Sequence, residues 1–283
     1  MNRLIALIVR FATNIWIWAR QNKLKAIFSI ILLYCAGELL TIPYLDIALL
    51  KTKNPSETAL MRQRIVEAGD IGKSLKISQR WIPLSRIPRH TVNAIIAAED
   101  GMFHAHRGID WFEVHESIER NLDEGRAARG ASTITQQLAK NLYLSTSKTP
   151  MRKLKEVIIT ILLERHLEKA RILELYVNLI EWGRGIFGIE SASRTYFGKS
   201  ASQLTLEESA RLAAVIPSPL KHRPDADSRY VLRRKKMVLA RMSSREKPSS
   251  PGQVPDSALP TFSREPAAID TITLQNTADS IDE

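Results

Sequence analysis

The sequence predicts a mainly α-helical protein with one N-terminal transmembrane helix and a disordered C-terminal tail. Three observations support this prediction: an apolar run near the N-terminus, apolar residues at helical spacing from Thr91 to about Met242, and a tail rich in Pro and Ser. The period-2 alternation of half-buried strands is scarce in the central segment. At 283 residues the chain is long enough for one substantial core with appendages.

The transmembrane helix is predicted from the stretch AIFSIILLYCAGELLTIPYL, residues 26–45. Its length matches the roughly 20 residues that a bilayer span needs. Glu38 is its one charged residue. Residues 1–25 contain five basic side chains and no acidic one, which is the positive-inside pattern of a cytoplasmic N-terminus. Everything after residue 45 is therefore expected on the outer face of the membrane.

Residues 1–25 are expected to form a basic segment that is cytoplasmic or lies at the membrane interface. Arg10 interrupts its apolar stretch, and Trp16 and Trp18 are side chains that favour the interface. The single cysteine, Cys35, excludes an intrachain disulfide and a metal site built from several cysteines.

The remainder divides into three segments. Residues 46–88 are expected to be a linker leading into the domain, with Pro83 and Pro88 near its end. Residues 89–243 are expected to be the functional domain, although its start could lie nearer residue 60. Residues 244–283 contain seven acidic and three basic side chains, so this tail carries a net charge of −4, against +11 for the whole chain, and the chain before it carries +15. That charge should attract phosphorylated ligands, other polyanions or an anionic membrane surface.

The stretch EDGMFHAHRGID, from Glu99 to Asp110, offers the first candidate acid–base group. Glu99 extends the apolar stripe of Val92, Ile95 and Ile96 at helical spacing, so its carboxylate should be partly desolvated. Desolvation raises a carboxyl pKa toward the range useful for proton transfer near neutrality. A helix end at which Glu99 reaches water explains the spacing about equally well.

The residues after Glu99 are expected to support it. If the helix continues, Phe103 and His106 lie on the same face as Glu99, whereas Asp100 is turned away and braces the turn with His106 and Gly108. His104 and His106 are better explained as hydrogen-bonding groups than as metal ligands, because no third ligand follows at zinc spacing.

The second motif, RGASTITQQLAKNLYL, predicts a flexible turn at Gly130 followed by a capped helix. Thr133 and Gln136 have the spacing of a capping box. A well-capped helix alone leaves the polar side chains of Gln137, Lys140 and Asn141 unexplained. Lys140 suits contact with a phosphate.

The third motif, KTPMRKLKEVIITILLERHLEK, predicts a helix with Thr149 as N-cap and Pro150 in its first turn. Arg152 and Glu156 are expected opposite its buried face, where a surface ion pair is one explanation. We favour an anion site, because the cations crowd a helix N-terminus that repels them and that binds phosphate well. The expected buried face consists of Leu154, Val157, Ile158, Ile161 and Leu162.

Two further motifs complete the domain. The segment RILELYVNLIEWGRGIFGIESA contains Gly183, Gly185 and Gly188, which permit close backbone approach, and Asn178 as a supporting polar group. The segment LTLEESARLAAVIPSP predicts a core helix that begins near Thr205 and ends before Pro217.

In this order, the five motifs resemble the glycosyltransferase family that polymerises bacterial cell-wall glycan. The match covers roughly residues 94–219, and the N-terminal anchor makes the chain similar to the monofunctional biosynthetic peptidoglycan transglycosylases. The resemblance implies a lysozyme-like helical domain with two lobes, the smaller of which faces the membrane. The substrate it implies is lipid II, which is joined into β-1,4-linked strands with inversion and release of polyprenyl diphosphate.

The resemblance also implies roles for individual residues. Glu99 matches the catalytic base, and Glu156 matches the acid that assists the diphosphate, directly or through a divalent cation. Lys140, Arg152 and Lys153 match diphosphate contacts, while Gln137 and Asn141 match polar groups of the cleft. No cofactor is expected to be obligatory, and Mg or Mn are the candidate ions. The supporting cleft is expected to contain Asp100, Phe103, His106, Gly108, Gly130, Ser132, Thr133, Gln136 and Asn178.

The expected location is the bacterial inner membrane, as a single-pass protein with its catalytic domain on the periplasmic face. Expected partners are lipid II, the growing glycan strand and proteins of cell-wall synthesis or division. Two alternatives stay open: a lysozyme-like hydrolase or lytic transglycosylase, and a membrane-anchored scaffold without activity. Nucleic acid is not an expected partner, because the basic residues are scattered and the domain is placed outside the cytoplasm.

Overall fold

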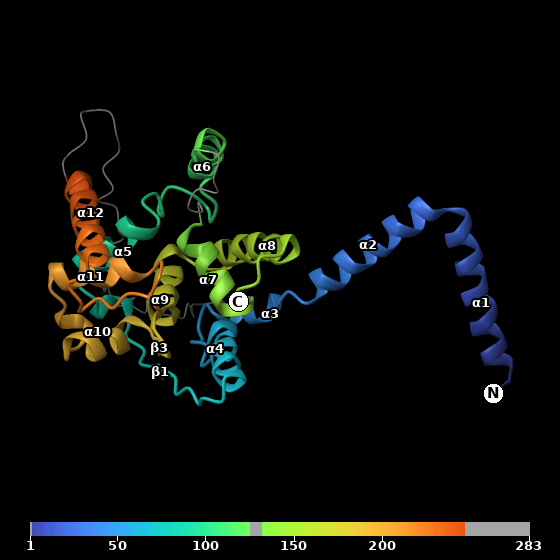
Figure 1. The fold of residues 1–283 in the computed structure, drawn as a ribbon, viewed down its shortest axis with the longest axis horizontal. Coiled ribbons are helices and arrows are strands. Elements are labelled where there is room, and N and C mark those ends of the chain that lie inside the picture. The colour runs from blue at the N-terminus through green and yellow to red at the C-terminus, as the bar shows by residue number, and fades with distance from the viewer. Residues whose placement is uncertain (1, 125–131, 247–283) are drawn as a thin grey trace, which may run out of the picture. The chain divides into compact units, whose positions relative to one another are not determined.

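The computed structural model describes residues 2–124 and 132–246, and within these ranges the chain is mainly helical, as predicted (Figure 1). The first helices are α1 (Asn2–Gln21), α2 (Lys23–Leu40), α3 (Tyr44–Leu49), α4 (Ala59–Asp70), α5 (Arg89–Glu99) and α6 (Trp111–Glu124). The later helices are α7 (Ile134–Tyr143), α8 (Pro150–His166), α9 (Lys169–Leu179), α10 (Ile189–Phe197), α11 (Leu206–Val215) and α12 (Arg229–Glu246). Two short 3-10 helices are η1 (Leu84–Arg86) and η2 (Ala201–Gln203). The tail was predicted to be disordered from residue 244, but residues 244–246 belong to α12; residues 247–283 lie outside the described ranges.

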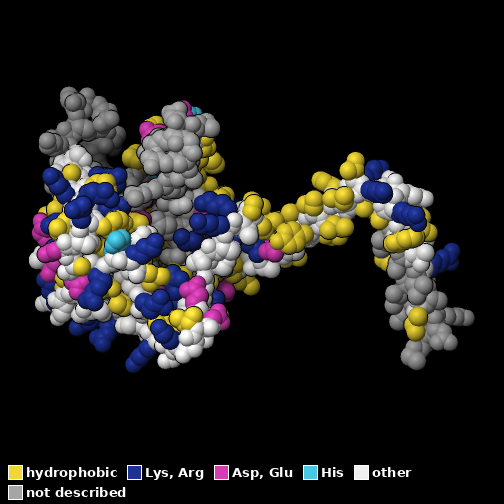
Figure 2. Space-filling model, viewed as in Figure 1, with side chains coloured by type: hydrophobic (Ala, Val, Ile, Leu, Met, Phe, Trp, Pro, Cys, Tyr) yellow, Lys and Arg dark blue, Asp and Glu magenta, His cyan; other side chains and the backbone are white. Residues whose placement is uncertain are grey.

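One stretch of the described residues, Lys23–Leu49, is long and apolar enough to cross a membrane. Figure 2 shows hydrophobic side chains covering α2, with Lys and Arg gathered at the bend between α1 and α2. The helix ends at Leu40 rather than continuing to residue 45. The Thr41 N–H turns back to the Glu38 carbonyl, and Pro43 has no N–H with which to continue a helix.

Residues 46–88 differ from the expected linker, because they form part of the hydrophobic core. Ile47 of α3, Met61 of α4 and Ile82 are each almost fully buried. Thr58 caps α4 by accepting a hydrogen bond from the Met61 N–H at 3.1 Å. The folded domain therefore begins well before residue 89, and the polar residues between these apolar positions conceal that in the sequence.

The core is built where α7 packs against α8 and α9, and where α5 packs against α11. The predicted helix starts are correct: Thr133 and Gln136 form a capping box on α7, Thr149 caps α8, and Thr205 caps α11. These starts depend on side chains only three residues apart, so the local sequence specifies them.

A small sheet, absent from the prediction, has the order β1-β3-β2. Strand β1 (Ser78–Gln79) runs parallel to β3 (Ile186–Phe187), which pairs antiparallel with β2 (Glu181–Gly183). Strands of two or three residues are too short to leave an alternating pattern in the sequence. Gly188 follows β3 with φ of +78°, and a Cβ there would lie 2.6 Å from the Asn178 carbonyl oxygen. This confirms the predicted close approach at that glycine.

Gly188→Ala is expected to lower the free energy of unfolding by about 3 kcal/mol, because it adds a backbone clash to the strain of a positive φ. Gly198→Ala is the matched control, since Gly198 also has a positive φ, of +69°, but a Cβ there would meet no described atom within 4 Å. The control should lose only about 1 kcal/mol. Denaturant unfolding of both variants, monitored by circular dichroism, measures the difference. Equal losses of unfolding free energy would show that the close approach at Gly188 does not destabilise the alanine variant.

The buried face of α8 was predicted correctly only in part, since Ile158 and Leu162 are partly buried and pack against the core. Its buried residues are Glu156, Ile159, Thr160 and Leu163, whereas Leu154 and Ile161 are 45% and 51% exposed. The segment VIITILL is apolar around most of the helix circumference, so periodicity does not decide which side packs against α7 and α9. Glu156 therefore points into the domain rather than away from it.

Candidate active site

Glu99, the last residue of α5, is held in a buried hydrogen-bonded chain. Only 8% of its side chain is exposed. Gln137 of α7 donates from Nε2 to Glu99 Oε2 at 2.9 Å, and the Tyr176 hydroxyl of α9 donates to Gln137 Oε1 at 2.9 Å. Gln137 Nε2 also lies 3.4 Å from the Ser132 carbonyl oxygen, which accepts from it. These contacts fix the orientation of the carboxylate.

The other oxygen of Glu99, Oε1, is buried and accepts no hydrogen bond within residues 2–124 and 132–246. Burial raises the pKa of Glu99, as predicted, and the Gln137 hydrogen bond together with the charges of Arg234 and Lys140 opposes that rise. A carboxylate with one oxygen anchored and the other not hydrogen-bonded by the described residues keeps the capacity to accept a proton there.

Asp100 points away from Glu99 and braces the turn that follows, as predicted. Its Oδ1 lies 2.9 Å from His106 Nε2, and its Oδ2 accepts from the Ile134 N–H at 3.0 Å. The Gly108 N–H donates to His106 Nδ1 at 3.1 Å, so the neutral imidazole has its proton on Nε2 and donates to Asp100. The Thr133 hydroxyl donates to the Gly108 carbonyl at 2.6 Å, which fastens the turn to the start of α7.

The expected continuation of the helix beyond Glu99 was wrong. Asp100 has φ of −157°, and Phe103 and His106 lie in the turn instead of on a helical face. Phe103 is still fully buried, and the Lys169 ammonium lies 4.4 Å from its ring centroid. The turn thus supports the site through the buried ring of Phe103, although this residue is not on a helical face with Glu99.

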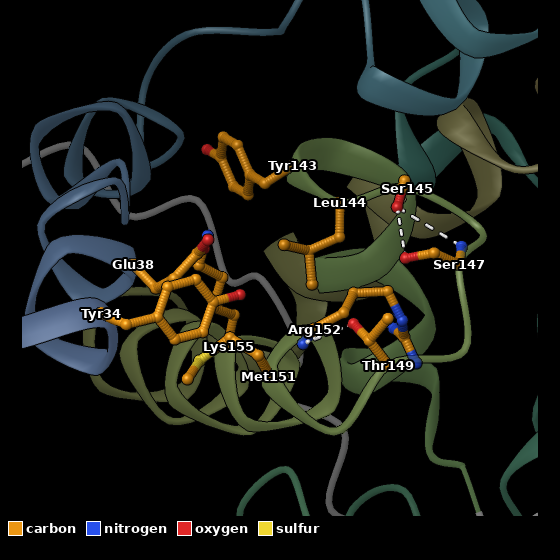
Figure 3. A pocket seen from close by; sticks show the side chains of 10 residues that line it. All are labelled: Tyr34, Glu38, Tyr143, Leu144, Ser145, Ser147, Thr149, Met151, Arg152 and Lys155. Atoms are coloured by element: carbon orange, nitrogen blue, oxygen red, sulfur yellow. Dashed lines mark hydrogen bonds and ion pairs between the residues drawn. The ribbon is translucent and has the colours of Figure 1, made fainter. Parts of the chain in front are cut away.

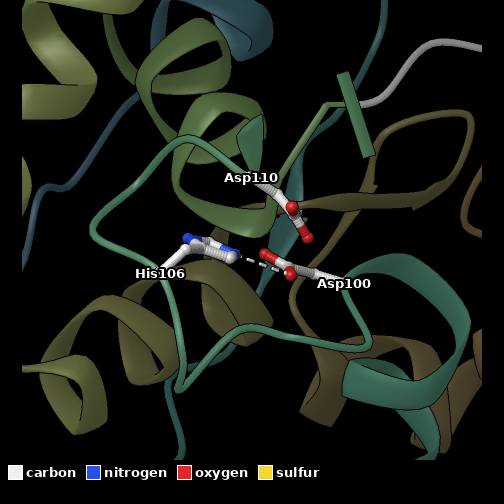
Figure 4. Close-up of side chains that lie close together, drawn as sticks. All are labelled: Asp100, His106 and Asp110. Carbon is white, nitrogen blue, oxygen red and sulfur yellow. Dashed lines mark hydrogen bonds and ion pairs between the residues drawn. The ribbon is translucent and has the colours of Figure 1, made fainter. Parts of the chain in front are cut away.

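Asp100, His106 and Asp110 form a group that could hold a metal ion, with ligand atoms within 4.8 Å of one another (Figure 4). Their hydrogen bonds already use most of these atoms, because Asp110 Oδ1 also accepts from the Glu113 N–H at 3.0 Å. A cation here would displace the contact between His106 and Asp100. The geometry therefore fits a braced turn at least as well as a metal site.

Glu156 is a second buried carboxylate, only 3% exposed, in the first turns of α8. Arg152 and Lys153 both donate to it, one to each oxygen. Lys140 of α7 is largely buried nearby, and burial lowers its pKa while the charge of Glu156 opposes that change. We call Lys140, Arg152, Lys153 and Glu156 the cation cluster; its three cations exceed its one carboxylate, so it attracts an anion.

Lys155 does not join this cluster. It forms an ion pair with Glu38 of α2 and donates to the Thr41 hydroxyl at 2.7 Å. This contact accounts for the one charged residue of the apolar run. Figure 3 shows the side chains of Glu38 and Lys155 at a cavity of about 260 Å³. The cavity is lined by Tyr34, Glu38, Tyr143, Leu144, Ser145, Ser147, Thr149, Met151, Arg152 and Lys155.

The remaining predicted residues have structural positions. Asn141 is buried on α7, and Gln136 completes the capping box of that helix. Asn178 joins α9 to the segment before α5, since its side chain accepts from the Ile82 N–H and donates to the Ile82 carbonyl, each at 2.9 Å. Gly130 lies outside the described residues.

Two residues in contact with the Glu99 network were missed by the sequence reasoning. Tyr176 was given no role in the sequence analysis, and only the contact of its hydroxyl with Gln137 reveals one. Arg234 lies in the run RRKK, which looks like a solvated basic face, yet Arg234 is buried and its Nη2 atom is 4.0 Å from Glu99 Oε1. No local pattern distinguishes it from its neighbours.

Residues 68–243 match the Transglycosylase family, which is more than half of the chain. The chain belongs to the transglycosylase family. It is similar to the biosynthetic peptidoglycan transglycosylase of Nitrosospira multiformis, with 46% identity over 191 residues, covering 68% of this chain and 83% of the relative. The corresponding protein of Laribacter hongkongensis is 39% identical over 228 residues, covering 81% of this chain and 96% of the relative.

Family membership confirms the predicted enzyme class and fold. The transglycosylase is a peptidoglycan glycosyltransferase that polymerises glycan strands in cell-wall synthesis, and its domain is lysozyme-like and mainly helical. The matched segment begins at residue 68, between the predicted start at 89 and the alternative start near 60, and ends at 243.

Proposed function

We propose that this transglycosylase polymerises lipid II with Glu99 as general base and with the cation cluster as the site of the departing diphosphate. The observation that supports this most is the position of α7. One turn of this helix presents Gln137, which holds Glu99, and Lys140, which lies close enough to Glu156 for their charges to interact. A rigid helix therefore sets the separation of base and anion site.

The chemistry follows from these two charges. Glu99 takes the proton from the 4-hydroxyl of the acceptor sugar, and that oxygen attacks the anomeric carbon of the donor. The bond to the diphosphate breaks on the opposite face, so the configuration inverts and polyprenyl diphosphate leaves. A diphosphate is a good leaving group, and the enzyme needs positive charge to receive it rather than a strong general acid.

The alternative of a hydrolase is less well supported by the geometry. A hydrolytic glycosidase needs a second carboxylate that is available as nucleophile or water-activating base. Glu156 is bound by Arg152 and Lys153, and Asp100 is bound by His106 and the Ile134 N–H. Purified full-length protein given lipid II should accumulate polymer. Shortening of preformed glycan without polymer growth would support the hydrolase instead.

Location and partners are proposed from the exposed surfaces. The apolar α2 anchors the protein in the membrane, and the exposed Leu154 and Ile161 of α8 belong to a lobe that faces the bilayer. Lipid II is then taken from the outer leaflet of the bacterial inner membrane, with the domain in the periplasm. The growing glycan strand would pass on from Glu99, and recruitment by cell-wall synthesis or division proteins stays a prediction.

We expect Mg or Mn, if used, to act on the diphosphate and not through Glu156, since both oxygens of Glu156 are engaged by protein cations. Adding the metal after chelation should then change the polymerisation rates of wild type and Glu156→Gln by the same factor. Rates of both proteins with EDTA and with a Mg series check this. A response confined to wild type would show that Glu156 binds the ion.

A further inference from the structure

Arg234 of α12 is a buried cation to which the reaction above gives no role. It is 7% exposed, whereas Arg233 and Lys236 beside it are exposed, and Lys235 forms an ion pair with Glu207. A charged side chain is rarely buried unless another group compensates it. Its surroundings must therefore explain its position.

The contacts of Arg234 lead to Glu99. Its Nε donates to the Ala214 carbonyl at the end of α11 at 2.9 Å, and the Tyr230 ring centroid is 5.9 Å from its guanidinium carbon. Its Nη2 lies 4.0 Å from Glu99 Oε1, the oxygen for which the described residues provide no hydrogen bond. This separation is too long for a hydrogen bond but short enough for strong attraction between charges in a buried site.

We propose that Arg234 is a positioning residue. It keeps Glu99 ionised and correctly oriented, and it leaves Oε1 free to accept the proton of the substrate. The proposal rests on the proposed role of Glu99 as base. A direct hydrogen bond from the guanidinium would compete with the acceptor hydroxyl for Oε1 and lower its basicity. At 4.0 Å the cation stabilises the anion without that competition.

The other groups that face Glu99 do not replace Arg234. Gln137 on α7 is neutral and anchors Oε2, and the Tyr176 hydroxyl on α9 is kept protonated because burial raises its pKa well above its usual range. Asp100, the next residue, repels a negative charge on Glu99. Lys140 on α7 is the other cation, but its charge favours the ionised form of Glu99 less than that of Arg234 does, and it also interacts with Glu156.

A purely structural role for Arg234 predicts different behaviour. Its hydrogen bond to Ala214 caps the last turn of α11, and loss of such a cap lowers stability without altering how activity depends on pH. A charge beside the base instead changes the acidic limb of the pH profile, which is the fall of kcat at low pH. The reason is that the base works only when it is ionised. The pH profile therefore separates the two roles.

The experiment measures kcat and KM for lipid II polymerisation against pH, using full-length wild type, Arg234→Gln, Arg234→Lys and the exposed control Arg233→Gln. In Arg234→Gln the acidic limb should move up by about one pH unit, and kcat below that limb should fall about tenfold with little change in KM. Arg234→Lys should restore most of the profile, and Arg233→Gln should match wild type. Melting temperatures report folding.

The proposal is overturned if folded Arg234→Gln has the same acidic limb in its kcat profile as wild type. It is also overturned if Arg234→Gln and Arg234→Lys lose stability equally and neither profile shifts with pH. If Arg234→Gln does not fold, the Arg234→Lys variant provides the test. A kcat and an acidic limb close to those of wild type support the proposal. Loss of activity in folded Arg234→Lys overturns it. Glu99→Gln in the same assay tests the base separately. If that variant stays active, the role of Glu99 itself is wrong.

Discussion

Replacing Glu99 with Gln is expected to lower kcat for lipid II polymerisation by about 10²–10⁴-fold while the protein stays folded. The amide has nearly the shape of the carboxylate, so the contact with Gln137 can persist after a flip of either amide. It has no basic oxygen for the acceptor hydroxyl proton. Stability should be unchanged or slightly higher, because the charged form of this carboxyl is disfavoured by burial.

The rate of polyprenyl diphosphate release and the melting temperature check this expectation together. Glu119→Gln is the matched control, since the Glu119 side chain is 63% exposed on α6 and pairs only loosely with His115 at 3.4 Å. The control should retain the wild-type rate. A folded Glu99→Gln protein within a few-fold of wild type would mean that another group takes the proton.

Lys140→Met is expected to lower kcat/KM by about 10²–10³-fold, through loss of a cation that receives the developing charge of the diphosphate. Its melting temperature should stay the same or rise, because burial of this ammonium is costly, as its lowered pKa shows. Activity is therefore expected to fall without a loss of stability. That pattern distinguishes a binding cation from one that only maintains the fold.

Lys148→Met is the control for this change, since Lys148 lies exposed in the loop before α8. Steady-state kinetics with lipid II, together with binding of inorganic diphosphate, measure the effect. Lys140→Met should weaken diphosphate binding, whereas Lys148→Met should not. Unchanged diphosphate binding by Lys140→Met would place the leaving group elsewhere.

How far the sequence predicted the fold depended on how local each signal was. The capping residues Thr133, Thr149 and Thr205 were correct, because each cap is formed within one turn of helix. The core packing of residues 46–88 and the sheet of β1, β2 and β3 were not predicted, since both depend on contacts between distant segments. The buried face of α8 was predicted only in part, because on an almost uniformly apolar helix the tertiary packing decides which side is buried.

The site shows the same division. The stripe ending in Glu99 predicted burial of this carboxyl correctly. The ion pair between Arg152 and Glu156, which the sequence analysis gave as the alternative, is present, and the favoured anion site stays a prediction. Glu156 was nevertheless expected on an exposed face. Arg234 and Tyr176 reach Glu99 and its partner Gln137 from helices far along the chain, and neither residue type nor spacing marks them. Tertiary contacts alone identify them.

The most direct test of Glu99 as the base is the pH dependence of the first glycosyl transfer, measured in single turnover by release of polyprenyl diphosphate. Wild type should show an acidic limb at a pH above the ordinary glutamate pKa of 4.5, because burial raises the pKa of Glu99. Below that limb the base is protonated and the rate falls. The residual rate of Glu99→Gln should lack the limb. The same acidic limb in wild type and Glu99→Gln would contradict the assignment.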